Sequence, residues 1–494
     1  MNGCDKKDAI DGFSKALPMM SGEDAMSRSL ARRRGRSASR RDFLKLSSAW
    51  GLGVSAPWVA PCSVLGTAAP SNRIHVAVIG NGNQSTIDLP AFLEQPDVQV
   101  LAVCDVNTAS HGYKTPDQFL GRKPVQEQVN AYYAKRAGSG QYKGCDAYND
   151  FRDVLARRDI DVVVLVVPDH WHAPMTVLAA EAGKDIYCEK PLSLTVEQGR
   201  AMVNAVRKHK RIFQTGSQFR SSPANRHGCE LVLNGRIGKL KRILTFIAEQ
   251  NAVDPGPGWK PEPVPEGFDY ELWLGPAPRA PYHSGRCLYR FRFNLDYSGG
   301  QTTNFGCHSN DIAQWGTANS HTAPIEYEDM GSEWPAPGGL YNTATKVAFR
   351  ARYADGLELI CQTADPFFGC RFEGSEGWVQ FDFKGLHTQP ESLKTSVIGP
   401  NEIRLPVSNP ARKQDAMKFY IPDHARNFLD AVKTRQDPIE PVEIGHRTAT
   451  LCHLGNIAMR LKRKIRFDPD KEQILGDEEA NRMLSRPMRA PWRI

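Results

Sequence analysis

The 494-residue sequence lacks any apolar run of the roughly 18–20 residues that a membrane-spanning helix needs. It also lacks a CxxC pair, an internal repeat and, beyond residue 69, any low-complexity tract. Hydrophobic residues make up 40% and charged residues 24%, as in an ordinary globular protein. These features exclude a polytopic membrane protein, a collagen-like chain and a disordered chain. At about 150 residues per domain, the length suggests roughly three units.

The cysteines show no pattern typical of a metal site or of a disulfide framework. Nine of the eleven follow residue 69, which is an odd number without paired spacing. The His170-x-His172 and Cys307-His308 pairs do not match an established zinc-ligand spacing either. We therefore expect no metal, and we expect most cysteines to be small buried apolar residues.

Positive charge is concentrated near the N-terminus. Residues 1–69 contain eleven Lys and Arg against six Asp and Glu, which accounts for most of the net charge of +8. The rest of the chain is close to neutral and lacks the dense basic surface of a protein that binds a phosphate backbone. Nucleic acid is therefore excluded as an expected partner.

The basic N-terminal segment is organised like an export signal. Residues 39–45 read Ser-Arg-Arg-Asp-Phe-Leu-Lys, which resembles a twin-arginine signal, and a short apolar stretch and an Ala-rich end follow. We expect residues 1–69 to be a removable leader that the twin-arginine export machinery reads. The mature protein is then periplasmic or otherwise exported. A disordered basic tail is the alternative.

A dinucleotide-binding fingerprint follows the leader. The apolar run 73–79 leads into Gly80-Asn81-Gly82-Asn83-Gln84-Ser85, then a helix-like segment and a second apolar run, 98–103, before Asp105. Gly80 suits a tight turn, Gly82 allows the backbone to approach a pyrophosphate, and the helix N-terminus offers N–H groups. Ser85 replaces the third glycine. Asp105 is spaced to bind the adenosine ribose and repels a 2′-phosphate, so NAD is favoured over NADP.

The alternation of strands and helices continues along the chain. Residues 161–167 form an apolar run typical of a buried parallel strand, and residues 185–188 form the next strand. Between them lie a Pro168-Asp-His-Trp-His172 loop and a helix over 173–182. We therefore predict an α/β protein whose N-terminal domain, residues 70–193, is a doubly wound parallel sheet.

With Glu189-Lys190-Pro191, the chain from residue 73 onward resembles the Gfo/Idh/MocA oxidoreductases. The resemblance implies a Rossmann domain followed by an α/β domain, residues 194–494, with a large open, mostly antiparallel sheet. This second domain is expected to bind substrate and to form a homo-oligomer, a dimer or tetramer. Its strands are expected at 240–249, 345–353, 357–363 and 377–383, and its C-terminal helices, 422–434 and 442–461, are expected to return to the first domain.

The resemblance also implies catalytic positions. Lys190 would lie near the nicotinamide and bind the hydroxyl group that is oxidised. His308 falls on the family's base position, and Asn304 stands four residues earlier, where the family has Asp. An amide cannot ionise, so the usual proton relay is in doubt. Two interpretations of Asp311 stay open: it supplies the charge, or it is structural.

The complete set of expected site residues combines the fingerprint and the resemblance. The cofactor, tightly bound NAD, is expected to contact Gly80, Asn81, Gly82, Asn83, Gln84, Asp105, Pro168, His172, Glu189 and Lys190. The substrate, a small-molecule carbohydrate, is expected to contact His172, Lys190, Asn304 and His308. Two interpretations of segment 286–293 stay open: its aromatic residues stack on a sugar ring, or they belong to an alternating strand face, which is favoured.

Three functions remain open. The leading one is an exported NAD(P)-dependent oxidoreductase that transfers hydride from a sugar, cyclitol or glycoside hydroxyl carbon to nicotinamide. The second is a glycosidase that retains NAD and works by oxidation, elimination and reduction without net redox change. The third is a sugar-binding protein without catalysis, which Asn304 supports and the presence of Lys190 and His308 disfavours.

Overall fold

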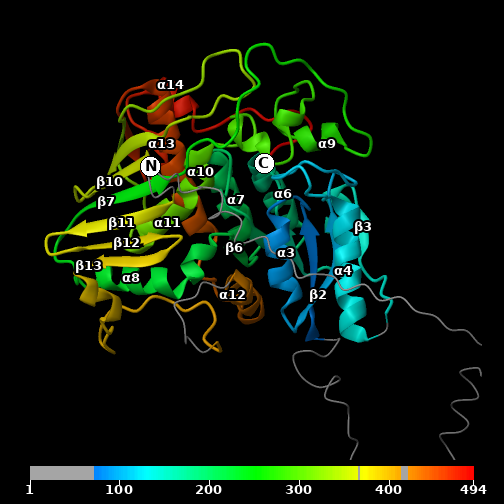
Figure 1. The fold of residues 1–494 in the computed structure, drawn as a ribbon, viewed down its shortest axis with the longest axis horizontal. Coiled ribbons are helices and arrows are strands. Elements are labelled where there is room, and N and C mark those ends of the chain that lie inside the picture. The colour runs from blue at the N-terminus through cyan, green and yellow to red at the C-terminus, as the bar shows by residue number, and fades with distance from the viewer. Residues whose placement is uncertain (1–71, 139, 365–367, 413–420) are drawn as a thin grey trace, which may run out of the picture. The chain divides into compact units, whose positions relative to one another are not determined.

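The computed structural model describes residues 72–494, except residues 139, 365–367 and 413–420. The expected leader, residues 1–69, lies outside the described residues. Two sheets organise the chain that follows it, one of six strands and one of nine (Figure 1).

The first sheet is wholly parallel, with the strand order β3-β2-β1-β4-β5-β6. Its strands are β1 (Ile74–Ile79), β2 (Val98–Cys104), β3 (Asp146–Tyr148), β4 (Val162–Leu165), β5 (Asp185–Cys188) and β6 (Phe213–Thr215). Both faces of β1 and β4 are buried, which explains their uninterrupted aliphatic sequences. The predicted doubly wound Rossmann sheet is confirmed. The sheet includes β6, which lies beyond residue 193, where we expected the domain to end.

Helices cover both faces of this sheet. They are α3 (Ser85–Leu93), α4 (Arg122–Ala137), α5 (Phe151–Leu155), α6 (Asp169–Glu181) and α7 (Val196–Lys208). Alternate residues of β1 face opposite sides. Val76 packs in one buried cluster with Phe92 of α3, and Ala77 packs in another with Met202 of α7. This two-sided packing fixes the strand ends at which the cleft described below opens.

The second sheet is mostly antiparallel, with the order β13-β12-β11-β7-β10-β9-β8-β14-β15, as expected; only β7 and β10 pair in parallel. Its strands are β7 (Leu240–Ile247), β8 (Glu326–Asp329), β9 (Ala348–Arg352), β10 (Glu358–Thr363), β11 (Gly369–Gly374), β12 (Trp378–Asp382), β13 (Gly385–Gln389), β14 (Ile465–Asp468) and β15 (Gln473–Ile474). One face is buried, because alternate residues such as Phe349 and Phe372 pack with the helices in a single core cluster.

Helices and short turns complete the second region. They are η2 (Gln218–Ser221), α8 (Pro223–Leu233), α9 (Tyr270–Leu274), η3 (Ser284–Arg286), η4 (Arg290–Phe293), α10 (Gln301–Asn304), α11 (Gly306–Trp315), η5 (Glu391–Thr395), α12 (Ile421–Thr434), α13 (Val442–Leu461) and α14 (Glu478–Arg482). Phe428 of α12 shares a buried cluster with Phe92, and Ala449 of α13 shares another with Met202. The C-terminal helices thus connect the two sheets (Figure 1).

The described residues also bear on disulfide bonds, metal binding and membrane spans. All nine cysteines from Cys104 to Cys452 are free and buried. No group of three or more His, Cys, Asp or Glu side chains in the described residues is placed to hold a metal ion. None of the helices in that part of the chain has the length and apolarity to cross a bilayer.

Gly80 is expected to be irreplaceable for two separable reasons. Its φ is +94°, and an added Cβ would lie 2.1 Å from the carbonyl oxygen of Val166. Gly112 has nearly the same φ, +89°, but its Cβ would meet open space. Gly112→Ala should therefore cost about 1 kcal/mol from backbone strain, whereas Gly80→Ala should cost about 1–3 kcal/mol more from overlap. Thermal unfolding of both variants measures the difference, and equal losses would contradict this account.

Candidate active site

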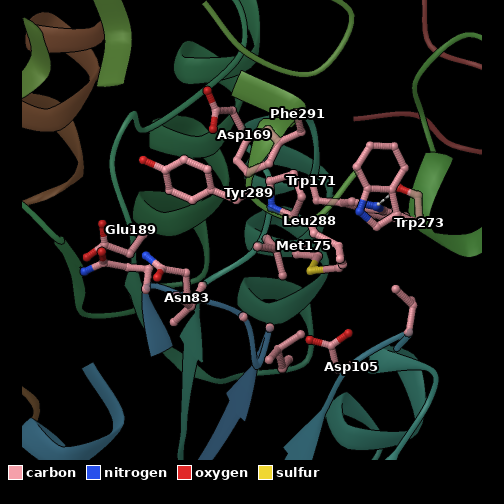
Figure 2. Close-up of a pocket in the computed structure, with 18 of the residues that line it drawn as sticks. Asn83, Asp105, Asp169, Trp171, Met175, Glu189, Trp273, Leu288, Tyr289 and Phe291 are labelled. Atoms are coloured by element: carbon pink, nitrogen blue, oxygen red, sulfur yellow. Dashed lines mark hydrogen bonds between the residues drawn. The ribbon is translucent and has the colours of Figure 1, made fainter. Parts of the chain in front are cut away.

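A cleft opens at the carboxyl ends of β1, β2, β4 and β5. It lies at the point where the strand order reverses between β1 and β4, the usual ligand position of such sheets. Its free volume, counted out to open solvent, is about 1210 Å³. In Figure 2, Asn83 and Asp105 lie at the strand ends, while Asp169, Tyr289 and Phe291 lie on the opposite side. Both sequence regions therefore contribute to one cleft.

The glycine turn forms the floor of the cleft beside α3. Gly80, Gly82, Asn83 and Gln84 line it. A Cβ at Gly82 would lie 3.0 Å from the ring of Tyr113, so glycine keeps this approach open. Ser85, at the missing third glycine, begins α3, and its hydroxyl group donates to the carbonyl oxygen of Gly82 at 2.8 Å. The turn thus keeps its shape without the third glycine.

Asn81 belongs to the turn but does not line the cleft. Its side-chain amide donates to the carbonyl oxygen of Cys104 at 3.0 Å. Its backbone N–H donates to Asp105 at 2.6 Å, and the N–H of Asn107 donates to the other carboxylate oxygen at 2.7 Å. Burial raises the pKa of Asp105, and these two N–H bonds oppose the rise. Asp105 lines the cleft and also ties the turn to the end of β2.

The residues of this cleft fit a nicotinamide dinucleotide. The turn at Gly82 has no space for a side chain, and Asp105 stands at the end of β2, where a ribose carboxylate partner is needed. On the opposite side, Asp169 is only 5% exposed, and its Oδ2 has no hydrogen-bond partner among the described residues. A buried acceptor without a donor is costly, and a ligand hydroxyl or amide would satisfy it.

Lys190 and Asn304 meet in the same cleft. Lys190 follows the end of β5, and its Nζ donates to Oδ1 of Asn304 at 3.0 Å. The amide nitrogen of Asn304 donates to Gln301 at 2.9 Å, which fixes which way the amide faces. The structure therefore brings together a cation from the first region and an amide from the second.

His308 is not among the residues that line the cleft. One residue, Phe305, interrupts the expected single helix, so that Asn304 ends α10 and His308 lies in α11. The imidazole makes an edge contact with Phe219, with ring centroids 4.9 Å apart, and its Nδ1 has no partner in the described chain. Burial and the charge of Lys190 hold its pKa well below the usual range.

Asp311 gives His308 no support. It accepts three hydrogen bonds of 2.6–2.9 Å from Arg220, and both side chains are almost fully buried. Of the two interpretations that the sequence left open for Asp311, the structure shows the structural one.

The expected loop around Pro168 is instead the first turn of α6, so that expectation is wrong. Nε2 of His170 and the indole N–H of Trp171 both approach the carbonyl oxygen of Trp273, at 3.0 and 2.9 Å. The two ring nitrogens of His172 lie 2.6 Å from the Pro191 carbonyl oxygen and 2.9 Å from that of Val167. The histidines therefore bind backbone. Pro168, Asp169 and Trp171 line the cleft. Figure 2 shows Asp169 and Trp171 there.

Glu189 lines the cleft beside a second buried carboxyl group, Asp88 of α3. Gln218 donates to Glu189 at 2.6 Å and lies 3.5 Å from Asp88. Burial raises the pKa of Glu189 to about 7, although Lys190 opposes the rise. Burial and the charge of Glu189 raise the pKa of Asp88 as well. Burial thus disfavours the ionised form of both neighbouring carboxyl groups.

Sequence reasoning missed several cleft residues in the segment 286–293. The segment forms the 3₁₀ turns η3 and η4, so the expected alternating strand is wrong. Leu288 has a φ of +52°, unusual for leucine, and Tyr289 and Arg292 line the cleft beside it. The many aromatic and basic residues of the segment were a signal in the sequence, but nothing in the sequence indicated the turn.

The comparisons with known proteins identify the family. The model described as "Oxidoreductase family, NAD-binding Rossmann fold" matches residues 74–217, and the model described as "Oxidoreductase family, C-terminal alpha/beta domain" matches residues 257–494. The chain belongs to the Gfo/Idh/MocA oxidoreductase family. Its first region is accordingly an NAD-binding Rossmann domain.

Curated relatives of this family member match only over short segments. A "Glycosyl hydrolase family 109 protein" of Shewanella sp. (strain W3-18-1) is 34% identical over 139 residues, 28% of this chain and 27% of that protein. The levoglucosan dehydrogenase of Pseudarthrobacter phenanthrenivorans is 39% identical over 107 residues, 22% of this chain and 27% of that protein. The matched segments thus span about a quarter of those two relatives.

Solved structures share the fold at low identity. The aldose-aldose oxidoreductase from Caulobacter crescentus, in complex with glycerol, has a TM-score of 0.55 at 19% identity, covering 80% of this chain and all of that one. Levoglucosan dehydrogenase in complex with NADH and L-sorbose has a TM-score of 0.54 at 17% identity, covering 80% and 98%.

The raised pKa of Glu189 predicts a pH-dependent stability. A carboxyl group whose pKa is raised from 4.5 to about 7 on folding binds more protons in the folded state between these values, so stability falls as pH rises through this window. Glu189→Gln should remove this loss. The difference in free energy of unfolding between this variant and the wild type should therefore shift in favour of the variant by of the order of 3 kcal/mol from pH 5 to pH 8. Urea unfolding of the cofactor-free proteins at both pH values measures it.

Asp88→Asn serves as the companion variant, because it removes the like charge but keeps Glu189. It should reduce the pH dependence as well, because it removes a carboxyl group whose own pKa is raised by burial and by Glu189. If the stability difference between the wild type and Glu189→Gln is the same at pH 5 and pH 8, the raised pKa of Glu189 is refuted.

Proposed function

We propose that this oxidoreductase is exported and oxidises a hydroxyl group of a sugar, cyclitol or glycoside, using NAD. The observation that carries the proposal is the 3.0 Å contact between Lys190 and Asn304 in a cleft that fits a dinucleotide. Lys190 and Asn304 can bind the oxygen of one hydroxyl group from two sides. The family's sugar dehydrogenases, levoglucosan dehydrogenase among them, support this class of substrate.

Each cleft residue has a proposed task. Lys190 donates to the substrate oxygen and stabilises the negative charge that grows there as its proton leaves. Asn304 orients the hydroxyl group, and His172 holds the Pro191 backbone that positions Lys190. His308 contacts Phe219 and does not line the cleft, so it is assigned no task here. When bound, NAD supplies the hydride acceptor.

The finer features of the proposal follow from charge and sequence. The carboxylate of Asp105 disfavours the 2′-phosphate of NADP, so the cofactor is NAD, tightly held. The twin-arginine segment at residues 39–45 supports export, and the large half-exposed sheet supports homo-oligomer formation. Native mass spectrometry of the purified protein should show a bound dinucleotide whose mass distinguishes NAD from NADP.

Removing the Lys190 ammonium group should stop turnover without unfolding the cleft. We expect Lys190→Met to lower kcat by about 10²–10⁴-fold, the usual range for a positioned acid–base or electrostatic group, while NADH still binds. Lys135→Met, on the exposed side of α4, is the matched control and should leave both unchanged. Full activity of Lys190→Met on the sugars that the wild type oxidises would overturn the site assignment.

A second candidate function is an NAD-retaining glycosidase. The relatives named glycosyl hydrolase family 109 protein favour it, because some match at 32–34% identity. Oxidation at one sugar carbon acidifies the neighbouring C–H bond, elimination releases the aglycone, and the hydride then returns. Export also favours a cofactor that is regenerated in each turnover.

Turnover without added cofactor separates the two functions. An oxidoreductase should form product from a free sugar in proportion to added NAD, or to a second carbonyl substrate. A glycosidase should release the aglycone of a nitrophenyl glycoside with no added NAD and no net NADH. Aglycone release by the wild type that persists in Lys190→Met would contradict both assignments.

A further inference from the structure

The proposed reaction needs a group that takes the hydroxyl proton, and the contacts of His308 do not favour it for this role. The imidazole packs on Phe219, its ring lies 6.2 Å from that of Phe368, and it does not line the cleft. Asn304 carries no charge, and Asp311 is bound to Arg220. No carboxylate therefore assists His308 among the residues that the structure describes.

Tyr289 lines the same cleft as Lys190 and Asn304 and has a side chain that can take a proton. A turn closed by the Arg290 N–H and the carbonyl oxygen of the buried Cys287, 3.1 Å apart, has Leu288 and Tyr289 at its centre. Leu288 takes a left-handed φ of +52°, which costs about 1–2 kcal/mol and is maintained by the surrounding packing. In Figure 2 the ring of Tyr289 projects into the cleft between Asp169 and Glu189.

The contacts of Tyr289 favour its phenolate form. The guanidinium carbon of Arg292 lies 3.9 Å from the centre of the Tyr289 ring, and Nε of Arg292 donates to the backbone carbonyl oxygen of Tyr289 at 2.8 Å. The amide of Asn251 donates to the phenol oxygen at 3.4 Å. Lys190 lines the same cleft. A cation fixed to the residue's own backbone cannot swing away as the charge develops.

The electrostatic balance agrees with this geometry. Burial raises the pKa of Tyr289, but the charges of Arg292, Lys114 and Lys190 and the bond from Asn251 together outweigh it, so the pKa lies below the ordinary value. Two carboxyl groups, Asp169 and Glu189, also line the cleft and oppose these cations. Most other buried tyrosines shift upward; Tyr133, for example, has its pKa raised to about 12 by burial.

We propose that Tyr289 is the catalytic base, taking the proton from the substrate hydroxyl group that Lys190 and Asn304 hold. The inference rests on the proposed function and adds a residue to it. The O–H bond breaks and its proton goes to the phenolate oxygen of Tyr289. The neighbouring C–H bond breaks and its electron pair leaves with the hydrogen as hydride for oxidised nicotinamide, while a C=O bond forms. The same proton transfer begins the oxidation step of either candidate reaction.

Spectroscopy tests the proposal independently of turnover. Phenolate absorbs in the near ultraviolet, so the wild-type minus Tyr289→Phe difference over a pH titration isolates this residue. It should show a phenol that ionises below the ordinary tyrosine range, and Arg292→Met should move that ionisation to higher pH. The Tyr133→Phe difference is the control and should show ionisation only at the alkaline end. Ionisation of Tyr289 at or above the ordinary range would overturn the proposal.

Kinetics give the second readout. Tyr289→Phe should lower kcat by about 10²–10⁴-fold while the NADH dissociation constant, measured by fluorescence, stays the same. The wild-type kcat/KM should fall as pH drops through the ionisation of Tyr289. In Arg292→Met this fall should occur at higher pH. Tyr133→Phe should keep the wild-type kcat. Wild-type turnover in Tyr289→Phe, with its loss in His308→Gln, would assign the proton to His308 instead.

A failure of the proposed function would give other results than a failure of the Tyr289 proposal. A native protein without dinucleotide, or a Lys190→Met variant with full activity, would refute the oxidoreductase site. The ionisation of Tyr289, measured in the difference spectra, would still decide the charge claimed for this residue.

Discussion

The close approach of the turn after β1 to the end of β4 determines the rest of the site. Gly80 lies so near the Val166 carbonyl group that no side chain fits between them. This contact, with the Asn81 bonds to Cys104 and Asp105, brings the carboxyl ends of three strands to one edge. Everything that binds in the cleft is placed relative to that edge, including Lys190 at the end of β5.

Polar groups at this edge divide into those that hold backbone and those that face the cleft. His170, Trp171 and His172 bind carbonyl groups of Trp273, Pro191 and Val167. They connect α6 to the segments on either side of the cleft. Asp169, next to them in sequence, lines the cleft instead. Neighbouring residues of this helix thus do different things: Asp169 lines the cleft, and the three residues after it bind backbone.

Local sequence predicts those features whose causes are local. The aliphatic runs of β1 and β4, Gly80 and Asp105 could be read directly, because burial and a tight turn leave few alternatives. The orientation of His172 could not, since it depends on carbonyl groups of distant segments. Tyr289 was missed because a left-handed leucine directs it, and propensity argues against that conformation. Strands such as β14 and β8 are paired across more than a hundred residues and show little periodicity.

The nine buried thiols acquire a meaning if the chain leaves the reducing cytoplasm. Cys307 and Cys452, for example, have sulfur atoms only 3.8 Å apart inside the core. An unfolded chain would offer all of them to disulfide-forming catalysts, and random cross-links would compete with folding. A chain that crosses the membrane already folded presents none of them. If the chain is exported as proposed, the packing of these sulfur atoms protects them only when folding precedes transport.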